Sequence, residues 1–330
     1  MYYYSVIIPV YNRPQEIEEL LKSLSSQSVK NFEAIIVEDG STLSCRNVVE
    51  KFADGLSITY HAKPNTGRSD SRNVGMQLAK GDYFIFFDSD CIIPPGYFAR
   101  LTAHLEASHS DCFGGPDAAH QSFSDLQKAI SYAMTSFFTT GGIRGGKQAM
   151  ETFKPRTFNM GFSRMVYEKT GGFNNMLGED IDLSIRIAKA GFRISLCREA
   201  FVYHKRRMSF TKFYRQVRNF GTARINLALL HKGSLKPVHT LPALFLLGGA
   251  GIAAAAFFSL WVLAVPALYT VLLFVDALVK TRRIKTALLS VCAAYIQLAG
   301  YGWGSLKAFV LKIIFRKGLE SNEKLSQIYK

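Results

Sequence analysis

Cysteines are few in this sequence, and none of them stands in a pattern that forms a zinc site or a disulfide framework. The five cysteines are scattered and odd in number, without a C-x-x-C pair. Zinc ribbons and disulfide-rich secreted domains both need paired cysteines at defined spacings. The N-terminus also lacks the basic and then apolar pattern of a secretory signal peptide. These absences predict a reducing compartment, with the N-terminal part of the chain in the cytosol.

Acidic residues are almost missing from residue 201 onward. Residues 201–330 contain 19 Lys and Arg but only 3 Asp and Glu, whereas residues 1–200 contain 21 and 22. A net charge of +15 can indicate nucleic acid binding, but a nucleic-acid-binding domain would itself carry the excess. The first 200 residues are nearly neutral, so we expect no nucleic acid partner. The basic part is instead expected to face an anionic membrane surface.

Charged residues are also absent from two long runs in this basic part. Residues 238–275 form an uncharged stretch of 38 residues, and residues 286–306 form another of 21. About 20 apolar residues span a bilayer core. We therefore predict transmembrane helices near 241–258 and 259–279, and a third crossing or re-entrant helix near 286–306 before a basic tail. The alternative is a buried helical hairpin in a soluble protein, where uncharged runs this long are rare.

The first 115 residues alternate short apolar runs with amphipathic stretches. Runs of β-favouring residues at 4–10, 32–37 and 83–87 are separated by helix-like segments. Fully apolar strands that alternate with helices are typical of a parallel sheet covered on both faces. Ligands of such sheets bind at the carboxyl ends of the strands. Polar residues do follow these runs, namely Asn12, Asp39, Asp88 and Asp90.

Asp88 and Asp90 form a D-x-D pair directly after an apolar run. Two carboxylates this close repel each other unless a cation lies between them. Mg²⁺ or Mn²⁺ prefers such oxygen ligands and could bridge the pair to a diphosphate, neutralising charge on a leaving nucleoside diphosphate. Solvated loop acids are the alternative, but the position after the strand favours the metal.

Five further residues, in three parts of the sequence, have both a structural and a functional interpretation. Glu179 and Asp180 open an amphipathic helix, where acids favour the helix dipole, but Asp180 could also serve as a general base. His204 follows another strand-like run and is either a packed histidine or a metal ligand. Arg68 and Arg72 share one face of a predicted helix start, as surface charge or as ligands of a phosphate or ribose.

Six motifs in order resemble the family 2 glycosyltransferases. They are SVIIPVYNRP at 5–14, EAIIVEDGS at 33–41, GRSDSRNVG at 67–75, DYFIFFDSD at 82–90, NMGFSR at 159–164 and GEDIDLSIRI at 178–187. The resemblance covers roughly residues 4–205. It implies the GT-A fold, an α/β (Rossmann-like) nucleotide-binding domain with a mixed central sheet, here followed by a C-terminal α-helical membrane region.

The resemblance also implies roles for individual residues. Asp180 would be the catalytic base of an inverting displacement, and Asp88, Asp90 and His204 would hold the metal. Nucleotide binding would involve Pro9, Tyr11, Asn12, Asp39, Arg72 and Asp88. The sugar or acceptor pocket would be shaped by Asn159, Met160, Gly161 and Glu179.

Two departures from the family pattern matter for the prediction. Glu38 precedes Asp39 where two aspartates are more usual, a minor change if Asp39 makes the contact. The Q-x-x-R-W signature of processive synthases is absent, because Gln216 is followed three residues on by Asn219. With a membrane region too small for a polymer conduit, this favours addition of a single sugar to a lipid-linked or cell-envelope glycan acceptor.

These observations predict three regions. Residues 1–205 form the catalytic domain, 206–236 a basic amphipathic interfacial segment, and 237–330 the membrane region at the cytoplasmic membrane. The predicted partners are a nucleotide-sugar donor, the acceptor and the membrane, with Mg²⁺ or Mn²⁺ as cofactor. A donor-binding scaffold without activity and a sugar-nucleotide nucleotidyltransferase are the alternatives. The latter would have a glycine-rich phosphate loop where this chain has Pro9-Val10-Tyr11-Asn12.

Overall fold

The computed structural model describes residues 2–141 and 153–316, and these form two compact units. The first unit contains the described residues up to Ala118 and from Phe153 to His204. The second contains the described residues from Ala119 to 141 and from Lys205 to 316. The predicted catalytic domain over 1–205 also included residues 119–141, which the structure groups with the helices that follow His204.

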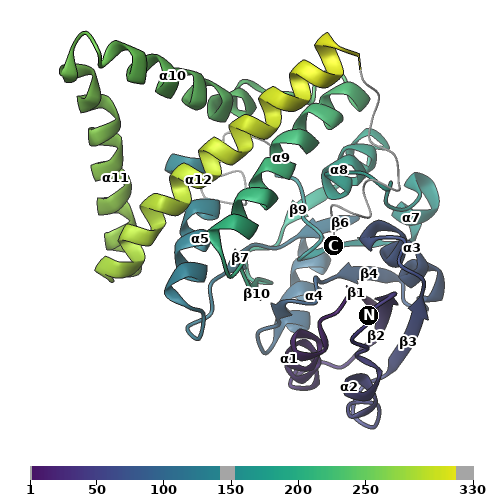
Figure 1. The fold of residues 1–330 in the computed structure, drawn as a ribbon. Coiled ribbons are helices and arrows are strands. Elements are labelled where there is room, and N and C mark those ends of the chain that lie inside the picture. The colour runs from purple at the N-terminus through teal and green to yellow at the C-terminus, as the bar shows by residue number, and fades with distance from the viewer. Residues whose placement is uncertain (1, 142–152, 317–330) are drawn as a thin grey trace. The chain divides into compact units, whose positions relative to one another are not determined.

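The first unit is built on a seven-stranded mixed sheet, which confirms the predicted fold class (Figure 1). The strand order is β3-β2-β1-β4-β8-β6-β9. The first four of these strands are parallel to one another, whereas β8 runs antiparallel to both β4 and β6. The strands are β1 (Tyr4–Val10), β2 (Phe32–Asp39), β3 (Ile58–Lys63), β4 (Tyr83–Phe86), β6 (Cys112–Gly114), β8 (Met160–Ser163) and β9 (Ile194–Leu196).

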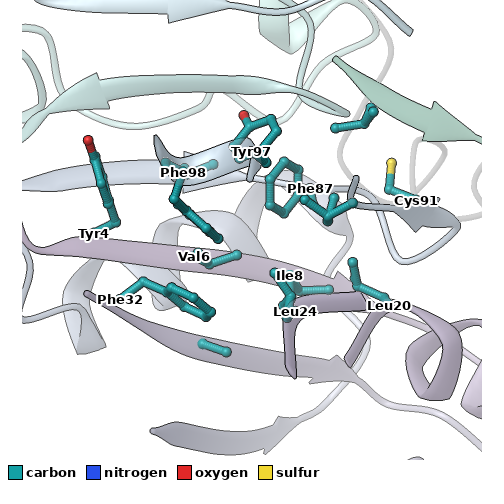
Figure 2. Close-up of a cluster of buried hydrophobic side chains, with 14 of the residues drawn as sticks. Tyr4, Val6, Ile8, Leu20, Leu24, Phe32, Phe87, Cys91, Tyr97 and Phe98 are labelled. Atoms are coloured by element: carbon teal, nitrogen blue, oxygen red, sulfur yellow. The ribbon is translucent and has the colours of Figure 1, made fainter. Parts of the chain in front are cut away.

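Helices cover both faces of this sheet, so β1 and β4 are apolar except for the buried Ser5. Successive residues of β1 enter different cores: Val6 and Ile8 join one cluster, and Ile7 joins the other. Figure 2 shows the first cluster, in which β1 packs against Leu20 and Leu24. The helices are α1 (Pro14–Ser25), α2 (Arg46–Glu50), α3 (Arg68–Leu78), α4 (Tyr97–Ser108), α7 (Arg164–Thr170) and α8 (Glu179–Lys189).

A small second sheet brings distant residues to the end of β4. It consists of β5 (Cys91–Ile92), β10 (Val202–His204) and β7 (Asp117–Ala118) in the order β5-β10-β7. The antiparallel pairing of β10 with β5 sets His204 opposite Cys91, next to Asp90. Backbone pairing therefore fixes the position of this histidine.

The second unit is helical. Its α-helices are α5 (Asp125–Thr135), α6 (Phe137–Thr140), α9 (Phe210–Leu230), α10 (Leu241–Ala255), α11 (Ala264–Thr281) and α12 (Ile284–Phe309). Short 3₁₀ segments, η1 (Pro237–Thr240) and η2 (Leu260–Leu263), precede α10 and α11, and a π-helical turn, η3 (Val310–Ile314), ends α12.

Helices α9 and α12 lie side by side in close contact (Figure 1). A Cβ at Gly221 would lie 2.1 Å from the carbonyl oxygen of Tyr301, and one at Gly304 would lie 2.0 Å from that of Arg218. Only glycine allows two backbones to approach this closely. The glycines of α12 therefore serve helix packing within the protein.

Helix α9 makes up most of segment 206–236, which was predicted to be interfacial, and one side of it packs on protein. Phe213 and Val217 on its apolar side pack into a cluster with Ile130 and Met134 of α5 and Ala293 of α12. An interfacial helix would instead bury this side in lipid. The basic amphipathic pattern was visible in the sequence, but the partner of its apolar side was not.

Within residues 2–141 and 153–316, three helical segments are long and apolar enough to cross a membrane: Pro237–Ala255, Leu260–Thr281 and Ile284–Ile314. In the most apolar window of each, protein covers 6% of the first, 11% of the second and 44% of the third. Large apolar side chains at the α10–α11 connection are about nine-tenths exposed, namely Phe257, Phe258 and Trp261. Exposed apolar surface of this extent indicates contact with lipid or another partner.

Candidate active site

Asp90 is the centre of a charged cluster at the carboxyl end of β4. Its Oδ1 lies 3.2 Å from Nε2 of His204, and its Oδ2 lies 2.5 Å from Nη1 of Arg13. The His204 ring stacks on Phe158 with 4.9 Å between ring centroids. The structure thus brings together Asp90 and His204, two of the residues predicted to hold a metal.

Arg13 is a site residue that the sequence analysis did not single out. It follows β1, and its side chain reaches the D-x-D loop 77 positions further along the chain. Burial alone would lower the pKa of Arg13, but the Asp90 carboxylate raises it above its ordinary value, so the guanidinium stays charged. The only signal in the sequence was a cation in the Y-N-R-P motif, directly after the first strand.

A second cluster of ion pairs lies around Arg72, whose side chain is only 1% exposed. Its Nη2 donates to Oδ1 of Asp88 at 2.8 Å, and its Nη1 donates to Oε1 of Glu179 at 3.1 Å. Arg68, one turn earlier on α3, also pairs with Glu179, and its Nη2 donates to Oε2 at 3.0 Å. Arg72 therefore connects the D-x-D loop to the first turn of α8.

Asp180, the predicted base, follows Glu179 in that first turn. Its side chain is 18% exposed, and its Oδ2 lies 4.0 Å from Nη1 of Arg156. Its Oδ1 accepts a hydrogen bond from the backbone N–H of Ile181. Burial raises the pKa of Asp180 above its ordinary value, an effect that the nearby Arg156 opposes and the Glu179 carboxylate reinforces.

This raised pKa predicts the pH dependence of turnover. A base must be deprotonated to accept a proton, so kcat/KM should fall as the pH drops through the pKa of Asp180. We expect the midpoint of this acid limb above the ordinary aspartate value of about 3.9. A pH–rate profile over the range in which the protein stays folded measures it. A midpoint at or below the ordinary value would contradict the assignment.

The predicted nucleoside-binding residues follow β1 and β2. Asp39 is 5% exposed, and its carboxylate accepts hydrogen bonds from Lys63 and from the backbone N–H groups of Thr66 and Gly67. Asn12 has a φ of 53°, and its side-chain oxygen accepts from the backbone of residues 42 and 43. Both side chains hold the loops at this edge of the sheet. The adjacent residues Pro9 and Tyr11 are partly exposed.

The four residues predicted to shape the sugar or acceptor pocket are buried in the protein; one of them is Glu179, which pairs with Arg68 and Arg72 as described above. Asn159 has no exposed surface; its Oδ1 accepts from the Tyr97 hydroxyl, and its Nδ2 donates to the carbonyl of Ala200. Met160 is also fully buried. At Gly161, a Cβ would lie 2.4 Å from the Phe113 ring. Asn159, Met160 and Gly161 therefore contact other parts of the protein.

The chemistry of these side chains fits a hard divalent cation. Ligand atoms of Asp90, Cys91 and His204 lie within 4.8 Å of one another. Burial raises the pKa of the Cys91 thiol well above its usual range, and Mg²⁺ or Mn²⁺ prefers oxygen ligands to a thiol. The carboxylates of Asp90 and Asp88 and the imidazole of His204 remain. Oxygen donors with one imidazole suit Mg²⁺ or Mn²⁺.

Comparison with known proteins identifies the family. The model of glycosyl transferase family 2 matches residues 5–171, about half of the chain. The chain therefore belongs to glycosyl transferase family 2, as the six motifs predicted.

The relatives include proteins from bacteria and archaea. An uncharacterized glycosyltransferase of Rickettsia felis is 31% identical over 184 residues, which are 56% of this chain and 30% of that protein. The glycosyltransferase AglE of Haloferax volcanii is 25% identical over 74% of this chain and 80% of its own length. The chain spans about three-tenths of the length of the first curated relatives it matches.

A solved structure has the same fold. It is a mannosyltransferase from Pyrobaculum calidifontis, in complex with GDP-Man and Mn²⁺, with a TM-score of 0.66 and 19% sequence identity. The match covers 96% of this chain and 88% of that one. The predicted GT-A architecture is thereby confirmed.

Proposed function

We propose that this protein is a membrane-anchored glycosyltransferase that moves a sugar from a nucleotide-diphosphate-sugar to a hydroxyl group. The observation that carries the proposal is the Asp90–His204 pair beside Asp88, at the strand ends of a family 2 chain. The Pyrobaculum neighbour, in complex with GDP-Man and Mn²⁺, supports a donor and a metal of these classes.

The residues of the site form two clusters, one proposed to bind the metal and the diphosphate and the other proposed to act on the acceptor. Asp90, Asp88 and His204 would hold the divalent cation, which when bound neutralises the negative charge of the leaving diphosphate. Arg13 keeps a fixed positive charge at the same place. Arg72 orients the Asp88 carboxylate through its 2.8 Å hydrogen bond.

Asp180 would act on the acceptor. Its carboxylate takes the proton of the acceptor hydroxyl while that oxygen attacks the anomeric carbon from the face opposite the diphosphate, so the configuration is inverted. Glu179, whose oxygens are held by Arg68 and Arg72, fixes the first turn of α8 and hence the position of Asp180. The nucleoside would bind by the strand ends that carry Pro9, Tyr11, Asn12 and Asp39.

The second unit would anchor the protein in the cytoplasmic membrane. The 6% and 11% cover of the first two apolar segments supports two crossings, and the larger cover of α12 supports a re-entrant or interfacial position. Both basic ends of the two crossings then face the cytosol, together with the catalytic unit. This location favours a lipid-linked or cell-envelope glycan acceptor and the transfer of one sugar at a time.

The test is a donor screen on the detergent-purified full chain, following release of the nucleoside diphosphate. We expect release from one nucleotide sugar with Mn²⁺ or Mg²⁺, and a loss of at least about a hundredfold when the metal is chelated. Restoring the metal should restore the rate. Donor binding without release in the presence of membrane lipid extract would favour a donor-binding scaffold. Release that is unaffected by chelator would contradict the metal site.

A further inference from the structure

The described residues 119–141 follow β7 of the first unit but pack among the helices of the second. They contain α5 and α6, and both helices contact α12, with α5 beside it in Figure 1. Residues 129–141 include no Asp, Glu, Lys or Arg. The proposed transferase site uses none of these residues, so their apolar character needs another explanation.

Two hydrogen bonds fix where this segment lies along α11. The Tyr132 hydroxyl donates to Oδ2 of Asp276 at 2.7 Å, and the Tyr269 hydroxyl donates to the carbonyl oxygen of Phe138 at 3.0 Å. Helix α11 ends at Thr281, so Asp276 lies five residues and Tyr269 twelve residues before its end. At a rise of 1.5 Å per residue these positions are about 8 Å and about 18 Å along the helix axis. From Tyr132 to Phe138 the segment therefore runs along α11, away from the end of that helix.

These positions become depths if α11 crosses the membrane, and this step rests on the membrane anchoring proposed above. Basic residues directly after α11, at 282, 283 and 285, place its end at the cytosolic surface. A hydrocarbon core is about 30 Å thick, so the backbone of Phe138 lies near its middle. The first unit contains the described residues on both sides of the segment, up to Ala118 and from Phe153. The segment thus enters the hydrocarbon layer without crossing it.

The side chains of the segment suit a hydrocarbon environment. Phe137 is 45% exposed and Phe138 is 42% exposed. One turn before Tyr269, Val265 of α11 is 63% exposed and adds to the apolar surface. Polar groups in hydrocarbon have no water to bond and must be satisfied within the protein. The four hydroxyl groups between residues 135 and 140 meet this requirement, because all of them bond protein oxygens, namely those of Thr135, Ser136, Thr139 and Thr140.

We propose that residues 132–140 form a re-entrant segment that reaches the middle of the bilayer, where Phe137 and Phe138 contact lipid acyl chains. Exposed phenyl rings at this depth match hydrocarbon, and the Tyr269 hydroxyl satisfies the Phe138 carbonyl group that the lipid could not bond. The catalytic unit is then attached to the membrane by a segment from within its own sequence, as well as by the helices that follow it.

The test measures the depth of nitroxide spin labels on the full chain in phosphatidylcholine nanodiscs. Phe138→Cys and Phe137→Cys are each made together with Cys292→Ser, because Cys292 is exposed and the other four cysteines are buried. Power saturation compares the accessibility of each label to oxygen, which concentrates in hydrocarbon, and to a water-soluble nickel chelate. We expect both labels to be more accessible to oxygen than to the nickel chelate.

Two matched labels calibrate this measurement. Leu268→Cys, at a residue that is 70% exposed beside Tyr269, reports the depth of α11 itself. Gln121→Cys, at an exposed position before α5, should show the opposite preference, for the nickel chelate. The labels at 137 and 138 should resemble the label at 268 in their ratio of oxygen to nickel accessibility.

The outcomes separate this proposal from the membrane anchoring on which it rests. If the label at 268 prefers oxygen but those at 137 and 138 prefer the nickel chelate, the re-entrant segment is wrong and the crossing by α11 stands. If the label at 268 also prefers the nickel chelate, the crossing itself is wrong and the re-entrant segment falls with it. Low accessibility of the labels at 137 and 138 to both reagents would show a protein contact in place of lipid and would overturn the proposal.

Discussion

Asp180→Asn is expected to lower kcat for sugar transfer by about 10²–10⁴-fold, the usual contribution of a general base. Asparagine has nearly the same shape, but it cannot accept a proton from an acceptor hydroxyl. The change should leave the donor Kd within a few-fold, because the donor contacts are assigned to Asp90, Asp88 and the strand ends. Single-turnover transfer and donor titration with the same preparation measure both quantities.

Asp182→Asn is the matched control for this experiment, since it makes the same change two positions later in α8. The Asp182 carboxylate is 2% exposed and accepts from Asn174 and Arg186 within the protein. We expect it to cost about 1–3 kcal/mol of stability, the usual effect of weakening a buried hydrogen bond. Its kcat per folded molecule should stay near the native value. If Asp180→Asn lost donor binding together with turnover, the base assignment would be wrong.

The carboxyl edge of the sheet could be predicted because its signals are local. The apolar runs at 4–10 and 83–87 correspond to β1 and to β4 with Phe87, and the polar residues that follow them lie at one edge. The predicted helix start that carries Arg68 and Arg72 is the beginning of α3, Arg68–Leu78. Burial on both faces imposes a continuous apolar pattern on each strand, and that pattern can be read from a few residues in succession.

The pairing of side chains across the site could not be predicted in this way. Arg13 meets Asp90 across 77 positions, and Arg72 meets Glu179 across 107. Each of these residues is compatible with a solvated surface when considered alone. Only the fold shows that Arg72 is almost completely buried between two carboxylates, and that Arg13 is a component of the D-x-D cluster.

The sequence also left open which surfaces cover the amphipathic helices. The apolar side of α9 was visible as a pattern, but α5 and α12 or a lipid surface could equally have covered it. In the structure, α5 and α12 cover this side of α9, and Phe213 lies in a protein core.

The N-M-G motif at 159–161 marked the site in the resemblance. In the structure, however, the side-chain oxygen and nitrogen of Asn159 hydrogen-bond to Tyr97 and Ala200 within the protein. A motif identifies the place of a residue, whereas its contacts decide whether it can reach a ligand.

Asp90→Ala is expected to remove metal-dependent donor binding, with a donor Kd in Mn²⁺ weakened by at least about a hundredfold. The carboxylate lies between His204 and Arg13, so its loss removes a metal ligand and leaves two cationic or basic groups facing each other. Titration of a nucleoside diphosphate with and without Mn²⁺ measures the effect. Asp54→Ala, which removes an acid from an exposed position of the same unit, is the control.

The metal dependence separates the two functions that the Asp90 carboxylate could have. If the Asp90 carboxylate only neutralises Arg13, Asp90→Ala should bind the diphosphate as well as the native protein or better, because Arg13 is then free to contact a phosphate oxygen. Mn²⁺ should then improve binding as much as in the native protein. If the Asp90 carboxylate is a metal ligand, Mn²⁺ should no longer improve diphosphate binding by Asp90→Ala. Arg13→Gln, made in the native protein, should keep the improvement by Mn²⁺ but bind the diphosphate more weakly without metal. An unchanged Mn²⁺ effect in Asp90→Ala would reduce the Asp90–His204 pair to a structural contact and would leave Asp88, held by Arg72, as the remaining acidic ligand of the cluster.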